Sequence, residues 1–225
     1  MMVLSWLGEV LYPPKCILCG SVLKKQETDL CGACRVSAPY YPYSRVNPAP
    51  KGNLNLRFLD SFTSVWYYEG DVRKSIHRFK FCRRAHLSAG YGRMVAMRLE
   101  ESFPDGFDFL TWVPVSTLRR MGRGYDQAEL LARAVGRELC FPPKRLLKKI
   151  RNTRPQFKQA TKEARRANVA GAFAPCVNED LTGKRVVLLD DIYTTGATAA
   201  ECGRILRGLG AKEVHIATIA AAQRR

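Results

Sequence analysis

The segment VVLLDDIYTTGAT (186–198) constrains the fold of this 225-residue chain more than any other part of the sequence. Its apolar start does not alternate with polar residues, which predicts a parallel strand covered on both faces. Asp190 and Asp191 follow at the carboxyl end of that strand, where ligands bind in open α/β sheets. A Thr- and Gly-rich turn and a helical segment come next, so we expect the acids and the turn to share one edge of the sheet.

The acids and the turn have complementary binding properties. Two adjacent carboxylates are hydrogen-bond acceptors, which suit neighbouring hydroxyls or a divalent cation. Backbone N–H groups at the start of a helix bind anions, and Gly196 allows a close approach or a positive φ. The segment therefore predicts a ligand with a vicinal diol beside a phosphate, such as a phosphorylated ribose. The alternative is an ordinary strand that ends in an acidic turn before a well-capped helix.

The segment resembles the 5-phosphoribosyl-1-diphosphate (PRPP) signature of type I phosphoribosyltransferases, in which two acids, a short variable stretch and Thr-Gly-x-Thr follow a hydrophobic run. The resemblance implies that Asp190 and Asp191 bind the ribose 2′ and 3′ hydroxyls. It assigns the 5′-phosphate to the turn, whose residues are Thr194, Thr195, Gly196, Ala197 and Thr198. The phosphate motifs G-x-x-x-x-G-K-[ST] and G-x-G-x-x-G do not occur in the sequence.

Four of the eight cysteines have the spacing of a structural metal site. Two C-x₂-C pairs, Cys16 with Cys19 and Cys31 with Cys34, predict a tetrahedral Zn²⁺ site closed by four thiolates. Disulfides are the alternative, and cytosolic chains rarely form them. A site of four sulfurs has no open position, so we expect the zinc to be structural. The other four cysteines are expected to be small buried hydrophobes.

Most of the net charge of +17 is concentrated in one segment. Residues 111–170 contain 15 Lys and Arg against 4 Asp and Glu, an excess of eleven. PRPP carries about four to five negative charges, fewer than this excess, so a nucleic acid such as single-stranded DNA is a candidate partner of the same face. The alternative is a solvated basic surface without a partner.

The coarse pattern predicts an α/β chain with a small N-terminal region. We expect residues 1–50 to hold a short helix, the four-cysteine zinc knuckle and a Pro-rich connector, and residues 51–225 to form the phosphoribosyltransferase-like domain, a parallel sheet flanked by helices. Strands are predicted at 61–68, 109–115, 145–150, from 186 onward and at 213–221, and helices at 71–81, 86–101, 125–139, 161–170 and 199–209. No apolar stretch reaches membrane-spanning length and the apolar start lacks the features of a secretory signal, so a cytoplasmic protein is expected.

A phosphoribosyl donor also needs cations beside its diphosphate, which is the leaving group. The segment 113–120 follows a predicted strand, and the polar segment 151–160 is predicted to close over the site. The expected diphosphate-side residues are Ser116, Thr117 and Arg119, and the expected closing-loop residues are Arg151 and Arg154. Both assignments rest on the resemblance to type I phosphoribosyltransferases and, among them, to the amidotransferases that use PRPP.

The four-cysteine knuckle and four later segments, taken in order, resemble the ComF family, competence-associated phosphoribosyltransferase-like proteins linked to DNA uptake in natural transformation. The segments are FKF (79–81), VPVSTLRRMGRGYDQAELLA (113–132), RNTRPQ (151–156) and LLDDIYTTGATA (188–199). The chain departs from the family pattern at Cys82-Arg83, where a glycine commonly follows the aromatic-lysine segment. It also carries Asp126 where Asn is usual.

The resemblance implies PRPP as a ligand, Mg²⁺ with its diphosphate, and a transfer in which an unidentified acceptor attacks C1 as pyrophosphate leaves. Such catalysis depends on positioning and charge stabilisation, so no side-chain nucleophile is expected. A second interpretation is a PRPP-binding factor without turnover that binds single-stranded DNA and acts with DNA-uptake or recombination proteins, such as a competence helicase or ATPase. A third is a salvage enzyme in which zinc only staples the fold. The residues leave these three interpretations open.

Overall fold

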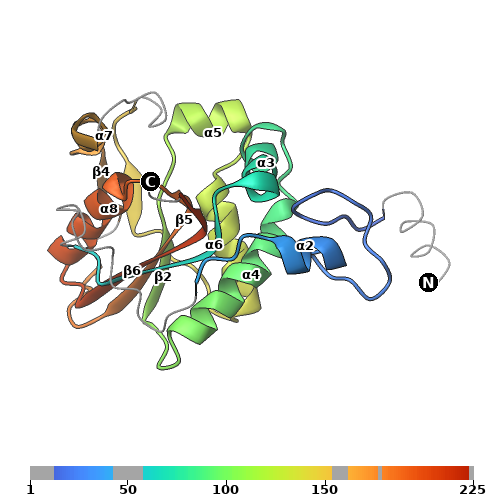
Figure 1. Cartoon of the computed structure of the whole chain (residues 1–225). Coiled ribbons are helices and arrows are strands. Elements are labelled where there is room, and N and C mark those ends of the chain that lie inside the picture. The colour runs from blue at the N-terminus through green and yellow to red at the C-terminus, as the bar shows by residue number, and fades with distance from the viewer. Residues whose placement is uncertain (1–12, 43–57, 154–161, 177–178, 223–225) are drawn as a thin grey trace, which may run out of the picture.

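The structure, a computed structural model, describes residues 13–42, 58–153, 162–176 and 179–222. The helices are α2 (Gly32–Ser37), α3 (Gly70–Phe81), α4 (Leu87–Ser102), α5 (Thr117–Arg123), α6 (Gln127–Glu138), α7 (Lys162–Val169) and α8 (Ala197–Gly208). The strands are β1 (Ser61–Tyr67), β2 (Phe109–Trp112), β3 (Leu147–Lys149), β4 (Phe173–Pro175), β5 (Arg185–Tyr193) and β6 (Glu213–Ala221). Figure 1 shows their arrangement. The helix predicted at the start of the chain and most of the predicted connector lie outside the described residues.

Four strands form one parallel sheet in the order β1-β6-β5-β2. This sheet confirms the predicted parallel α/β architecture. The strand expected at 145–150 does not join it, because β3 pairs with β4 in a separate antiparallel sheet. β3 has three residues, of which Leu147 is buried and Lys148 is exposed. Such a half-exposed strand does not suit a sheet that is covered on both faces.

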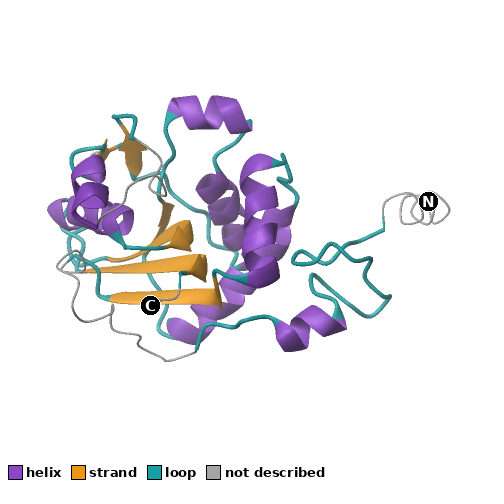
Figure 2. Ribbon diagram, turned by 45° about the horizontal axis from the view of Figure 1, so that its top comes forward, coloured by secondary structure: helices purple, strands orange, loops and turns teal. Residues whose placement is uncertain are grey.

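β5 is covered on both of its faces, as its apolar run predicts. Val187 and Leu189 belong to the core cluster that includes α3, α4 and α6. Val186 and Leu188 belong to a second cluster, formed with α8 and the β3–β4 pair. All four side chains are fully buried. Figure 2 shows helices on both sides of the sheet.

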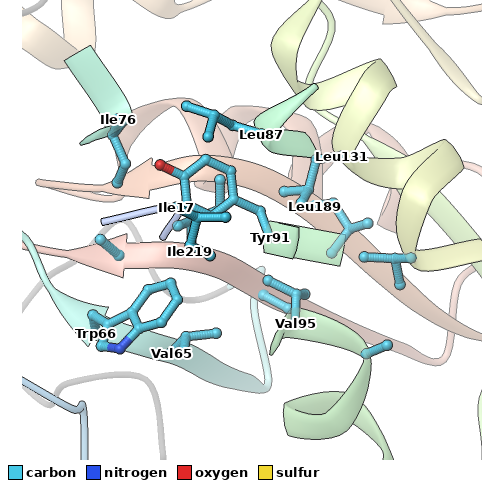
Figure 3. Close-up of a cluster of buried hydrophobic side chains, with 14 of the residues drawn as sticks. Ile17, Val65, Trp66, Ile76, Leu87, Tyr91, Val95, Leu131, Leu189 and Ile219 are labelled. Carbon is cyan, nitrogen blue, oxygen red and sulfur yellow. The ribbon is translucent and has the colours of Figure 1, made fainter. Parts of the chain in front are cut away.

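The first core cluster also includes part of the cysteine knuckle. Tyr91 of α4, Leu131 of α6 and Ile219 of β6 pack together in the centre of this cluster (Figure 3). Ile17, which lies between two of the knuckle cysteines, is buried among them. The knuckle is therefore packed on the helices that cover one face of the sheet.

The last part of the segment 113–120, from residue 117 on, is helical. β2 ends at Trp112, three residues short of the predicted strand end, and α5 begins at Thr117 with Ser116 as its N-cap. None of the α5 residues is buried, and Leu118 and Met121 are exposed by 64% and 74%. Figure 1 shows α5 at the top of the view, above the sheet. No helix in the described part of the chain has both the length and the hydropathy of a membrane-spanning segment.

Candidate functional site

The acidic pair lies inside β5, whereas the sequence pattern places it beyond the strand. β2 pairs with β5 as far as Leu189, so β2 no longer flanks β5 at Asp190. β6 supplies pairing partners further on, from Thr218 opposite Asp190 to Ala221 opposite Tyr193. The strand therefore runs through both acids, and they lie at the carboxyl end of the sheet, where a ligand is expected.

The two carboxylates influence each other. Burial, and then repulsion from Asp191, raises the pKa of Asp190 to about 8. The backbone N–H of Asp191 donates to Asp190 Oδ1 at 2.8 Å, which opposes the rise. Asp190 consequently holds a proton near neutral pH in the ligand-free chain. A carboxyl group whose pKa is strongly raised by burial and a neighbouring charge is typical of binding and catalytic sites.

Lys80 is a site residue that the sequence pattern did not single out. Its Nζ lies 2.8 Å from Asp191 Oδ1, and the two side chains are 18% and 13% exposed. Lys80 comes from the last turn of α3, within the FKF segment that is part of the resemblance to the ComF family. The ion pair joins α3 to β5 and neutralises one of the two carboxylates.

The turn after β5 has the conformation expected of an anion-binding loop. Gly196 is left-handed, with φ of 74°, and is the N-cap of α8. A Cβ at this position would overlap the Tyr193 hydroxyl and lie 2.8 Å from Tyr193 Cζ. Glycine is therefore required both by the backbone angle and by the close approach of the Tyr193 ring.

The start of α8 offers donors without a capping side chain. Gly196 provides no side-chain cap, and no acidic residue occurs in the first turn. Thr195 Oγ1 is buried without a hydrogen-bond partner among the described residues, a state that buried hydroxyls rarely adopt. Thr194 is exposed, and Ala197 is buried. Backbone N–H groups and an unsatisfied hydroxyl at a helix N-terminus fit a phosphate group.

Asp126 anchors the link between β2 and α5. Its Oδ2 accepts the backbone N–H of Val115 at 3.0 Å, and its Oδ1 accepts those of Ala128 and Glu129 at the start of α6. Ser116, the N-cap of α5, is buried, and Thr117 is exposed. Asn is usual at the position of Asp126 in the family that the chain resembles. Here Oδ2 of Asp126 holds the backbone of the segment 113–120, which is expected to lie beside the diphosphate.

Two cations meet at Thr153. Arg119 of α5 donates to the Thr153 carbonyl oxygen at 2.8 Å, and Lys149 at the end of β3 donates to Thr153 Oγ1 at 2.9 Å. Burial, and then repulsion from Arg119, lowers the pKa of Lys149 to about 8, while attraction from Asp190 opposes this. Lys149 was not predicted as a site residue. Lys149 is therefore close enough to Asp190 for the two charges to interact.

Of the two arginines predicted for the closing loop, the structure describes Arg151 and not Arg154. Arg151 is exposed, and its Nη2 donates to the carbonyl oxygens of Asn168 and Ala170, at 3.1 and 2.8 Å, where α7 ends. Arg151 is therefore hydrogen-bonded to the end of α7 in this structure. A contact between Arg151 and a ligand stays a prediction. Arg154 lies outside the described residues.

The four knuckle cysteines gather at one point, as their spacing predicts. The Sγ atoms of Cys16, Cys19, Cys31 and Cys34 all lie within 4.8 Å of one another. The Cys19 and Cys31 sulfurs are 3.7 Å apart. A tetrahedron with Zn–S bonds of about 2.3 Å has edges of about 3.8 Å, so the cluster fits Zn²⁺ and supports a structural metal.

Models of known protein families match both the cysteine region and the region that contains the acidic pair. A model of the double zinc ribbon domain matches residues 7–44, and a model of the phosphoribosyl transferase domain matches residues 127–225. Competence protein F of Haemophilus influenzae is 26% identical over 220 residues, which cover 90% of this chain and 94% of that relative. The chain is similar to this competence protein over nearly all of its length. Competence protein ComFC of Bacillus subtilis is 27% identical over 88% of this chain and 82% of its own length, and DNA utilization protein YhgH of Salmonella typhimurium is 27% identical over 89% and 87%.

The chain has a type I phosphoribosyltransferase fold preceded by the four-cysteine region. Of its four remaining cysteines, one is buried as expected and three are not. Cys202 is buried, Cys176 is half-buried, and Cys82 and Cys140 are exposed. Cys82 follows the last residue of α3, and Cys140 follows α6 with φ of 50°, so both fall at helix ends, which face solvent.

Proposed function

We propose that this protein is a member of the ComF family that binds PRPP and transfers its phosphoribosyl group to an acceptor, with release of pyrophosphate. The observation that supports this function best is the pair of carboxylates beside a helix start that has no capping side chain. The carboxylates of such a site accept hydrogen bonds from hydroxyl groups, and the N–H groups at the helix start donate hydrogen bonds to an anion. A ribose 5-phosphate has these two groups at adjoining positions.

The acidic pair is proposed to bind the ribose diol. Carboxylate oxygens accept hydrogen bonds from the 2′ and 3′ hydroxyls and repel phosphate. Lys80 offsets this repulsion at Asp191, since its ammonium group lies 2.8 Å from Asp191 Oδ1. The 5′-phosphate is proposed to bind to the turn of residues 194–198, where the buried Thr195 Oγ1 has no hydrogen-bond partner among the described residues.

The diphosphate is proposed to lie beside Ser116, Thr117, Arg119 and Lys149. Arg119 and Lys149 converge on Thr153 and supply two positive charges near the acids. Mg²⁺ bound with the diphosphate would supply further neutralisation of the leaving group. Arg151 and Arg154 are proposed to join this set when the segment 151–160 closes.

The transfer itself needs positioning and charge stabilisation. The bond from C1 to the diphosphate oxygen breaks, and its electron pair leaves with pyrophosphate. The acceptor forms a new bond to C1 and loses its proton. The cations stabilise the negative charge that develops on the leaving group, and exclusion of water protects the oxocarbenium-like C1 from hydrolysis.

The test is pyrophosphate release from PRPP with Mg²⁺ and a panel of nucleobases and amines. Release that depends on one acceptor is the expected result, and it should be lost when Asp190 and Asp191 are both changed to Asn. Binding of PRPP without release by any acceptor would contradict the transfer and leave the binding. Retained PRPP affinity in the double Asn variant would contradict the assignment of the acidic pair.

A second function, a PRPP-binding factor that contacts single-stranded DNA, is favoured by one surface. Phe81 at the end of α3 is 54% exposed, and Arg123 of α5 lies over its ring at 5.0 Å. The apolar side chains of Leu118 and Met121 are exposed on the same short helix α5. Exposed rings interleaved with arginines stack bases and bind the phosphate backbone. The names of two relatives, competence protein and DNA utilization protein, agree with this function.

DNA binding is testable apart from transfer. Binding of labelled single-stranded DNA should weaken steeply as salt rises, because bound counterions are released. Phe81→Ala should lower the affinity with little change in the salt slope, and Arg123→Gln should lower both. Affinity that is equal in the wild-type chain and both variants would contradict a role for this surface.

A further inference from the structure

Helix α3 contacts the cysteine knuckle with one part of its length. Ser75 Oγ donates to the carbonyl oxygen of Ile17. Arg78 Nη2 donates to the carbonyl oxygen of Leu18 at 2.5 Å and to that of Ile17 at 3.4 Å. Ile17 and Leu18 are the two residues between the first pair of zinc-site cysteines. The backbone that α3 binds is therefore the turn whose shape the metal sets.

The knuckle is closely fitted to the helices beneath it. Ser75 is fully buried, and its hydroxyl also lies 2.5 Å from the Tyr91 hydroxyl of α4. Arg93 of α4 forms a two-pronged ion pair with Asp29, at 2.6 and 2.5 Å. A Cβ at Gly90 would lie 2.7 Å from Ile17 Cγ2, so α4 and the knuckle approach each other too closely for a larger residue.

The last turn of α3 contacts the proposed PRPP site. Lys80 follows Arg78 by two residues, which is about 3 Å along a helix axis, and its Nζ lies 2.8 Å from Asp191 Oδ1. Phe79, between them, is fully buried, and its carbonyl oxygen accepts the Tyr125 hydroxyl. Arg78 and Lys80 are thus held in one rigid turn, so a shift of α3 at the knuckle also moves the ammonium group of Lys80.

We propose that zinc bound by the four cysteines fixes α3 through Arg78, and that α3 in turn holds Lys80 against Asp191, so that zinc binding and PRPP binding strengthen each other. Arg78 is then a positioning residue for the PRPP site, although it belongs to the knuckle contact. The coupling rests on the PRPP site proposed above. Without the metal, the Cys16–Cys19 turn loses its shape, the two carbonyl acceptors move, and the carboxylates lose the cation that offsets their repulsion of the ligand.

Coupling between two sites is reciprocal, so it can be measured from the zinc side. The full zinc-loaded chain is incubated with a zinc-selective chelator, with and without saturating PRPP and Mg²⁺. PRPP should increase the chelator concentration that removes half of the zinc by about fivefold or more, the lower range of typical couplings. PRPP affinity should fall by the same factor when the zinc is removed.

Variants separate this route from general stabilisation by a ligand. Arg78→Met keeps the aliphatic stem and loses the donors to Leu18 and Ile17, and PRPP should no longer protect its zinc even at full PRPP saturation. Arg78→Lys, which keeps a single donor nitrogen, should recover part of the protection. Arg73→Met is the matched control, since Arg73 lies on the same helix and is exposed. PRPP should protect the zinc of this variant as it does in the wild-type chain.

The outcomes distinguish the coupling from the function on which it rests. No PRPP binding by the zinc-loaded wild-type chain would overturn the proposed function. PRPP binding with unchanged zinc release would overturn the coupling alone, and so would equal protection in Arg78→Met and Arg73→Met. The wild-type comparison needs no substitution, so the coupling stays testable if Arg78→Met does not fold.

Discussion

Lys80 of α3 and Asp191 of β5 form an ion pair of 2.8 Å that is largely shielded from water. The pair connects a helix on one face of the sheet to the strand that carries the acidic pair. Removal of either partner leaves a poorly solvated charge beside Asp190. Folding stability, PRPP binding and the response to pH therefore all depend on this contact.

Lys80→Met should destabilise the fold by about 1–3 kcal/mol, because Asp191 keeps a shielded carboxylate without a partner. The free energy of unfolding is measured by urea denaturation. Lys74→Met is the matched control on the same helix, where Lys74 and Asp71 form a pair with side chains 73% and 48% exposed. Its cost should be below about 1 kcal/mol. Equal costs in the two variants would show that the Lys80 pair contributes no more than a surface pair.

Asp190→Asn should stabilise the free protein increasingly as pH rises. The pKa of Asp190 is raised to about 8 from an ordinary value near 3.8, so between these pH values the folded chain holds a proton that the unfolded chain has lost. Stability that depends on Asp190 therefore falls as pH rises through this window, by up to about 1.4 kcal/mol per pH unit. The Asn variant lacks this loss. Denaturation at pH 5 and pH 8 should show the larger gain at pH 8, and a larger gain at pH 5 would refute the raised pKa.

The same Asp190→Asn variant should lose PRPP affinity, because an amide cannot replace both acceptor oxygens of a carboxylate. Binding is followed by titration calorimetry in buffers with different ionisation enthalpies. In the wild-type chain, PRPP binding near pH 7 should release a proton from Asp190 if the ligand requires its ionised form. A variant that unfolds less readily but does not bind PRPP would indicate that Asp190 is kept for ligand binding at the expense of folding stability.

Gly196→Ala should weaken phosphate binding and destabilise the chain by more than about 1 kcal/mol, because alanine is disfavoured at φ of 74° and its Cβ would contact the Tyr193 ring. Gly208→Ala is the control at the other end of α8. No atom lies within 4 Å of a Cβ there, and its φ is not positive, so that substitution should be neutral or stabilising. Thermal unfolding and PRPP titration of both variants check the contrast.

Zinc removal should depend on pH and on the four knuckle cysteines. Burial raises the pKa of the Cys34 thiol, whereas a hydrogen bond with Ser21 lowers that of Cys19 to about 6. Zinc binds thiolates, so its affinity should rise with pH as protons are displaced. Cys34→Ser should lose the single zinc, and Cys82→Ser, which changes an exposed cysteine outside the cluster, should retain it. Metal content per chain, measured by mass spectrometry, decides this.

Local patterns predicted the parts of the site that lie close together in sequence. The apolar run, the acids and the glycine turn of residues 186–198 all belong to one strand-turn-helix unit, so periodicity and glycine chemistry were sufficient. The cysteine cluster was equally predictable, because C-x₂-C spacing brings two sulfurs together and the metal needs four. The finer position of the acids was wrong, since the length of β5 depends on its pairing with β6.

The features that the sequence did not reveal depend on contacts between distant segments. Lys80 meets Asp191 only because α3 docks beside β5, more than a hundred residues away in sequence. α5 has seven residues and buries none of them, so it lacks the long apolar stripe from which a core-facing helix could be predicted. Lys149 sits in a basic run, and only the pairing of β3 with β4 turns its side chain toward Phe173, at 4.9 Å from the ring.

The strand order has a consequence for how the chain is made. β1 pairs with β6, and Ser61 and His215 at the start of that pairing are separated by 154 residues. During synthesis β1 must therefore wait, with an open edge, until β6 has been translated, and pairing at such separation folds slowly and exposes the edge to aggregation. The cysteine knuckle emerges before β1, and α3 and α4 emerge during this delay. A nascent chain that takes up zinc early would hold these helices together while it waits, so zinc supply during translation should affect the yield of folded protein.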